Sequence, residues 1–207
     1  MKNNASRGLV AGMDVDALKK RIKTAPWREY WERMTKRWRE VAEWEEKTGR
    51  IIIIGSCAGQ NITWLVREAG LEYRLTGNED ALKYVEKQIG RLADIFLYHP
   101  ENWKKHEHPY WSEAAVCLAA DLCRDGLGQK NRDDLVRMVR DYFWKAPFIG
   151  WDGGYRYLGG HNMMLTEHMC AGMCVLSWGE EAGCKNRDEI IQKAVESAKL
   201  FCKHRLS

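Results

Sequence analysis

Apolar residues recur along most of this chain at the three- and four-residue spacing of helices, and the helices predicted from this spacing are of two kinds. The first kind is apolar on nearly every side and rich in Ala, Cys, Gly and Met. These segments are about 59–75, 111–125 and 161–178. The second kind has one charged face, at 79–97, 132–145 and 187–204. The first kind should be buried on several sides, and the second should lie outside it.

The two kinds alternate, and the turn before each charged helix repeats. Asn78, Asn131 and Asn186 lie 53 and 55 residues apart, each followed by acidic residues. An Asn side chain caps free N–H groups at a helix start, and acids in the first turn favour the helix dipole. The spacing therefore predicts three helical hairpins in an all-α fold, with an inner ring, an outer ring and little or no sheet.

Two further helices are predicted before the hairpins. The first begins at Asp14 or Asp16 and ends near Thr24, and the second runs from Pro26 to Gly49. Four tryptophans of the second helix are spaced close to whole turns and predict an aromatic seam packed on the body, with sugar stacking as the alternative. They are Trp27, Trp31, Trp38 and Trp44. Ile51 to Ile54 could form a short extended piece. Residues 1–55 thus form a lead-in with helices, continuous with the hairpin domain 56–207.

The links between hairpins are long, whereas the turns within them are short. In a stack of antiparallel hairpins, the links 98–111 and 146–162 emerge at one end and form a common rim. Aromatic loops on a rigid scaffold are frequent binding sites. The rim residues are His99, Trp103, His106, His108, Tyr110, Trp111, Trp151, Tyr155, Tyr157, His161 and Asn162.

The segment 146–178 is the strongest candidate for a site. Five glycines, together with Trp151, Tyr155 and Tyr157, precede an almost uncharged helix. This helix carries His161, Asn162, Glu167 and His168 near its start. Two simpler explanations stay open. Asn162 could only cap the helix, and Glu167 and His168 could form a buried pair that satisfies itself.

Composition narrows the classes of function. A chain of 207 residues with 45% hydrophobic and 30% charged residues can bury a substantial core. The net charge of +4 is spread over helices that alternate basic and acidic residues, which argues against a nucleic-acid partner. The seven cysteines lie mostly at apolar helical positions and are expected to be packed, reduced thiols.

Neither a secretion signal nor a membrane span is predicted, so the chain as written is cytoplasmic or part of something longer. No cofactor is predicted. A metal site built from histidines is a weak alternative, because His106 and His108 have poor spacing for a helix and no cysteine pair lies beside them. That set would be His99, His106, His108, His161 and His168.

The order of these features resembles the helical toroid domain of the heparinase II/III-like polysaccharide lyases, a family that includes alginate lyases. Four segments that together span most of the chain carry the resemblance: ALKKRIKTAPWREYWERM, AGLEYRLTGNEDALKYVEKQI, HPYWSEAAVCLAADLC and HNMMLTEHMCAGMCVLSW. The resemblance implies an incomplete α/α toroid that cleaves uronic-acid-containing polysaccharide by β-elimination. In the family an Asn or His neutralises the uronate carboxylate, while a Tyr and a His act as acid and base.

On this resemblance, His161 and Asn162 match the carboxylate position. The family's catalytic Tyr and second His come further along than Ser207, so Tyr157 and His168 are the remaining catalytic candidates here. Met163, Met164 and Leu165 also stand where the family has polar residues. The expected substrate-binding residues are Trp111, Trp151, Tyr155, His106, His108 and Arg156.

The resemblance also implies an acidic polysaccharide or oligosaccharide as partner, and family members are usually periplasmic or secreted. Half a toroid would leave one flank of its last inner helix uncovered, so Met169, Met173 and Leu176 should be partly exposed unless a second copy or a missing C-terminal half covers them. The alternative function, from a different class, is a non-catalytic carbohydrate-binding or assembly module with an aromatic rim.

Overall fold

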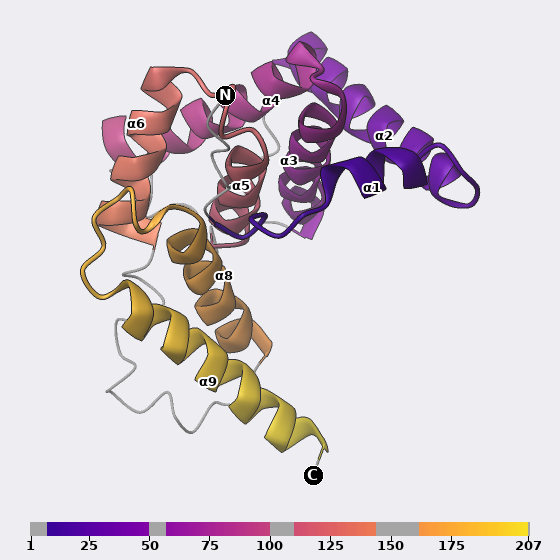
Figure 1. The fold of residues 1–207 in the computed structure, drawn as a ribbon. Coiled ribbons are helices and arrows are strands. Elements are labelled where there is room, and N and C mark those ends of the chain that lie inside the picture. The colour runs from indigo at the N-terminus through magenta and orange to yellow at the C-terminus, as the bar shows by residue number, and fades with distance from the viewer. Residues whose placement is uncertain (1–7, 50–56, 100–109, 144–161, 207) are drawn as a thin grey trace.

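The computed structural model describes residues 8–49, 57–99, 110–143 and 162–206 (Figure 1). These residues are mostly helical, and no strand occurs among them. The prediction of an all-α fold is therefore confirmed. Ile51 to Ile54, for which a short extended piece was considered, lie outside the described residues.

Eight α-helices and two π-helical turns make up the described part of the chain. The helices are α1 (Val15–Arg21), α2 (Trp27–Thr48), α3 (Cys57–Thr76), α4 (Glu79–Ala93), α5 (Tyr110–Leu122), α6 (Gln129–Met138), α8 (Asn162–Trp178) and α9 (Arg187–Leu206). The π-helical turns η1 (Asp94–Tyr98) and η3 (Val139–Phe143) directly extend α4 and α6. The predicted hairpins correspond to α3–α4, α5–α6 and α8–α9.

Three apolar helices, α3, α5 and α8, lie side by side as an inner row. Gly70 of α3 lies beside Ala119 of α5, and Arg74 reaches Asp125 just beyond α5 with 3.3 Å between Nη1 and Oδ2. Residue numbers therefore rise in the same direction along α3 and α5. Residue numbers also rise in the same direction along α5 and α8, so the three inner helices run parallel.

The contacts between α5 and α8 establish that direction. The thiol of Cys174 shares a hydrogen bond with Cys117. One turn further along α8, the Ser177 carbonyl accepts a hydrogen bond of 2.6 Å from Nη2 of Arg124, just beyond the end of α5. The N-termini of α3, α5 and α8 consequently lie at one end of the row, and their C-termini lie at the other.

The remaining helices flank this row (Figure 1). Helix α4 packs against α3 and α6, and α9 packs against α8, so the charged helices form an outer layer beside the row. Helices α1 and α2 pack against α3, on the side away from α8 and α9. From side to side, therefore, the α1–α2 pair lies next to α3, and the α8–α9 hairpin lies on the opposite side of α5.

Small residues let the inner helices approach closely. A Cβ atom added to Gly70 would lie 2.9 Å from both the Cα and the carbonyl oxygen of Ala119, which is too close for any side chain. Larger side chains from the outer layer fill the space beside the row. Phe96 and Phe143, from η1 and η3, meet edge to face with 5.2 Å between ring centroids. Such contacts fix the outer layer on the inner one.

Local signals set several helix ends as predicted. The Ala17 N–H donates to the Asp14 side chain at the start of α1, and the Asp80 N–H donates to the Asn78 side chain at the start of α4. Gly49 ends α2 in the left-handed conformation, with φ of 62°. Helix α9 begins directly after Asn186.

The prediction that Asn131 caps α6 is wrong. The helix begins at Gln129, and Gly128 occupies the N-cap position. The Gly128 N–H donates to Oε1 of Glu86 on α4, at 2.7 Å. This contact from the neighbouring outer helix holds the chain where α6 starts, so the helix begins earlier than the Asn131 signal indicates.

The predicted tryptophan seam is also only partly correct. Trp38 is buried, and its Nε1–H donates to Oε2 of Glu72 at 2.8 Å, but Trp27 and Trp44 are 48% and 38% exposed. At about 100° per residue, Trp44 points well away from the face shared by Trp27, Trp31 and Trp38. Trp27 lies on that face but at the start of α2, where it lines a pocket instead of the core.

The uncovered flank of α8 agrees with expectation. Met169 is 37% exposed, and Met173 and Leu176 are half-buried. These three side chains share the last helix of the inner row, where no further inner helix follows among the described residues. An apolar flank of this kind is where a second copy or a continuation of the chain would pack.

Candidate functional site

Most residues of the predicted site cannot be placed. Seven of them lie outside the described residues, namely His106, His108, Trp151, Tyr155, Arg156, Tyr157 and His161. Trp111 belongs to the first turn of α5 and Asn162 is the first residue of α8, but only their backbones are described. The side chain of His168 is described in full.

The two helix starts that carry Trp111 and Asn162 lie at the same end of the inner row, because α5 and α8 run parallel. In the sequence, each start directly follows one of the two long links. Free backbone N–H groups and the partial positive charge of a helix N-terminus both favour an anion. This end of the row therefore presents two such N-termini side by side.

His168 lies within the protein and not on an open surface. It is 3% exposed, and its Nδ1 lies 2.6 Å from Oγ of Ser197 on α9. Because the contact joins α8 to its outer partner, it favours a structural role for this histidine. The Glu167 side chain, considered as its partner, lies outside the described side chains.

The centre of the inner row holds a buried carboxyl group and several thiols. Burial raises the pKa of Glu113 on α5 well above its ordinary value of 4.5 and so favours the protonated carboxyl. Burial, followed by the hydrogen bond with Cys117, raises the pKa of the Cys174 thiol. Burial also raises the pKa of Cys123 to about 12. Cys123 and Cys174 are packed thiols with little thiolate, as expected, and are unsuited to nucleophilic catalysis. Cys202, by contrast, is exposed.

The raised pKa of Glu113 leads to a prediction about stability. Above pH 4.5 the unfolded chain ionises this carboxyl while the folded chain keeps it protonated, so the free energy of unfolding should fall as pH rises. Glu113→Gln removes this ionisation and therefore its contribution to the pH dependence of stability. Relative to wild type, the free energy of unfolding of the variant should rise by up to about 1.4 kcal/mol per pH unit as the pH increases above 4.5, measured by urea denaturation. Glu43→Gln, at an exposed position on α2, is the control. Parallel pH profiles for Glu113→Gln and wild type would contradict this assignment.

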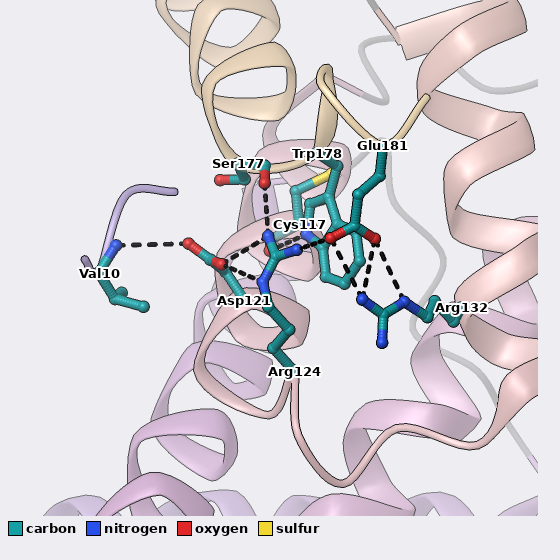
Figure 2. Close-up of polar contacts among 8 residues, drawn as sticks. All are labelled: Val10, Cys117, Asp121, Arg124, Arg132, Ser177, Trp178 and Glu181. Atoms are coloured by element: carbon teal, nitrogen blue, oxygen red, sulfur yellow. Dashed lines mark hydrogen bonds and ion pairs between the residues drawn. The ribbon is translucent and has the colours of Figure 1, made fainter. Parts of the chain in front are cut away.

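A polar cluster lies at the opposite end of the inner row from the two helix starts (Figure 2). Nη2 of Arg124 donates to Oδ1 of buried Asp121 at 2.8 Å, and the guanidinium lies 4.0 Å from the centroid of the Trp178 ring. Glu181 accepts from Arg124 and also from Arg132, the latter at 3.1 Å. Two arginines and two carboxylates thus balance one another around a buried tryptophan.

This cluster joins three separate segments of the chain (Figure 2). Asp121 Oδ2 accepts from the Val10 N–H at 3.3 Å, and Trp178 Nε1–H donates to the Cys117 carbonyl at 3.0 Å. The cluster therefore ties the N-terminal lead-in and the last hairpin to α5. Its charges are satisfied within the protein, so it is a structural network and not a binding site. The only signal in the sequence is the three-residue spacing of Asp121 and Arg124, which lie at and just beyond the end of α5.

A pocket of about 720 Å³ opens between α1, α2 and the C-terminal half of α3. Its walls combine aliphatic, aromatic and arginine side chains. The aromatic and charged members are Arg21, Trp27, Tyr30, Trp31, Arg33, Arg37 and Glu68. The sequence signal was the run TAPWREYWERM, in which aromatic and arginine residues recur at helical spacing. The pocket itself could not be foreseen, because it requires α1 to fold back beside α3.

The chain matches nothing when compared with family models, curated proteins and solved structures. Within the described residues, no helix is long and apolar enough to cross a membrane. The same residues contain no group of three or more His, Cys, Asp and Glu that could hold a metal ion. Any function proposed for the chain must therefore be supported by its own residues and their geometry.

Proposed function

We propose that this chain is part of an α/α toroid that acts on, or binds, polysaccharide containing uronic acid, as a lyase working by β-elimination. The observation that carries the proposal is the parallel direction of α5 and α8 in the inner row. It brings two helix N-termini to one end, and the two long links of the sequence lead into them. A bound uronate at this end would meet residues of both links and a favourable helix field.

The chemistry assigns a role to each candidate. In β-elimination a base removes the proton from C5 of the uronate, a C4–C5 double bond forms, and the C4–O bond breaks as the leaving oxygen gains a proton. We assign carboxylate neutralisation to His161 and Asn162, which lowers the cost of forming the carbanion. Tyr157 and His168 are the candidates for acid and base. The burial of His168 against Ser197 counts against it and leaves Tyr157 as the stronger candidate.

The proposed substrate contacts are of two kinds, aromatic and charged. We propose that Trp111, Trp151 and Tyr155 pack against sugar faces, and that Arg156, His106 and His108 contact neighbouring carboxylates. We further propose that a second copy or a missing C-terminal half covers the α8 flank around Met169.

The proposal is tested with the purified chain and polymers of different charge. We expect ultraviolet absorbance to rise with alginate or heparan sulfate, since elimination creates an unsaturated uronate, and to stay constant with neutral dextran. Calorimetric titration with the same polymers measures binding separately. If no uronate polymer gives either an absorbance change or measurable binding, the proposal is refuted.

The second candidate, a carbohydrate-binding module without catalysis, is favoured by one observation. His168, one of the few groups suited to proton transfer, is buried and already bonded to Ser197. Binding of uronate polymer without any rise in absorbance would select this candidate. Turnover would exclude it.

A further inference from the structure

We propose that the pocket between α1, α2 and α3 binds an organic carboxylate with an apolar, ring-containing body. This ligand class is separate from the polysaccharide proposed above. The pocket contacts the C-terminal half of α3, through Glu68, Leu71 and Leu75, whereas the proposed sugar site lies at the N-terminal end of the inner row. The two sites can therefore be tested independently.

The size and lining of the pocket fit a small molecule with an apolar body. Its volume of about 720 Å³ is in the usual range for a small-molecule site. Leu18 contributes from α1, Ile22 follows directly after α1, and Leu71 and Leu75 contribute from α3. Leu75 is buried and the other three are half-buried, so the floor is aliphatic and partly open to solvent. Covering this floor with an apolar ligand would remove exposed apolar surface from water.

Aromatic side chains form one wall. The rings of Trp27 and Tyr30 are 6.3 Å apart at 47°, and the two residues are 48% and 58% exposed. Large aromatic side chains with this much exposure beside a pocket are suited to packing against a flat ligand. We therefore expect the body of the ligand to contain a ring.

The charge of the lining selects an anion. Three arginines face one carboxylate, and Nε of Arg37 already pairs with Oε2 of Glu68 at 3.3 Å. Arg21 and Arg33 lie over aromatic rings, 5.6 Å from the Trp27 centroid and 4.7 Å from the Tyr30 centroid. Within the described part of the chain, neither has a carboxylate partner. A carboxylate on the ligand can pair with their planar guanidinium groups.

The same lining disfavours a sugar in this pocket. Hydroxyl groups of a buried sugar need hydrogen-bond partners, and the aliphatic floor of Leu18, Ile22, Leu71 and Leu75 offers none. Hydroxyl groups left without partners carry a desolvation cost. An apolar body with a single carboxylate avoids this cost while using both the arginines and the rings.

The test uses 2-naphthoate as the probe and 2-naphthylmethanol, which lacks the charge, as its neutral counterpart. Calorimetric titration should show that the full chain binds naphthoate at least about tenfold more tightly than the alcohol. Arg21→Gln and Arg33→Gln should each weaken naphthoate binding about tenfold. Arg28→Gln, at an exposed position of α2 outside the pocket lining, should leave it unchanged.

A second variant separates the pocket from general charge effects. Trp27→Ala keeps every arginine but removes one wall, and it should weaken binding of both naphthoate and the alcohol. Circular dichroism of each variant checks that the fold is kept. The proposal is overturned if naphthoate does not bind, or if naphthoate and the alcohol bind with equal affinity. It is also overturned if Arg28→Gln weakens binding as much as Arg21→Gln and Arg33→Gln do, or if glucuronate binds more tightly than naphthoate.

Discussion

Replacing Asn162 by aspartate is expected to lower the rate of elimination by at least about a hundredfold while leaving the fold intact. The proposed task of Asn162 is to donate a hydrogen bond to the uronate carboxylate, and an aspartate there would repel that carboxylate instead. Removing one donor from a site that stabilises developing charge typically has an effect of this size. The measurement is the initial rise of ultraviolet absorbance with uronate polymer.

This substitution distinguishes chemistry from helix capping. Asn and Asp cap helices about equally well, so a residue that only caps α8 should tolerate the change. Asn186→Asp, placed directly before α9, makes the same substitution at the other end of the hairpin and should leave the rate unchanged. If Asn162→Asp keeps full activity, Asn162 is a capping residue and the proposed carboxylate site loses its support. His161→Ala is expected to reduce the rate as well.

Replacing Trp178 by alanine should lower the free energy of unfolding by about 4 kcal/mol. The side chain is fully buried, donates to the Cys117 carbonyl and lies beneath the guanidinium groups of Arg124 and Arg132. Alanine would leave a cavity and a carbonyl without its donor. Urea denaturation followed by circular dichroism measures the change.

An exposed tryptophan provides the control for that experiment. Trp44→Ala on α2 removes a side chain that is 38% exposed and should cost less than about 1 kcal/mol. Trp178→Phe should fall between the two, because it keeps a ring beneath the arginines but loses the hydrogen bond to Cys117. Similar losses in Trp44→Ala and Trp178→Ala would show that the polar cluster does not depend on the buried ring.

The sequence alone predicts a structural feature correctly where the residues that cause the feature lie close to it in the chain. Asp14, Gly49 and Asn78 each act on backbone groups within four residues, and the helix ends that they predict are those observed. The helical spacing of apolar residues likewise separated buried from amphipathic helices. Such signals need no knowledge of which helices pack together.

Prediction from sequence failed where the cause lies in a distant residue. The start of α6 depends on Glu86, which holds the Gly128 amide from another helix, and this contact overrides the signal of Asn131. Trp27 lines the pocket formed with α1 and α3 and remains 48% exposed, although it shares a helix face with Trp38. Helical spacing along one element could not reveal either contact.

The candidate sites show the same difference between local and distant causes. The rim residues are predicted from loop composition and a family resemblance, and, except for His99, their side chains lie outside those that the structure describes. The polar cluster was not foreseen, because Arg124 and Glu181 are far apart in the sequence and meet only when two hairpins pack. The pocket was missed for the same reason, since α1 and α3 line it together.

The linear order of the inner row also determines how the protein can open. Each hairpin packs mainly on its neighbours, and the main packing of α9 is against α8, so the last hairpin can separate without disturbing α1 to α4. Separating this hairpin breaks the packing of α8 on α5, together with the contacts of Glu181 with Arg124 and Arg132. Transient opening of the molecule should therefore begin by exposing the buried face of α8, including Trp178, while α1 to α4 stay packed.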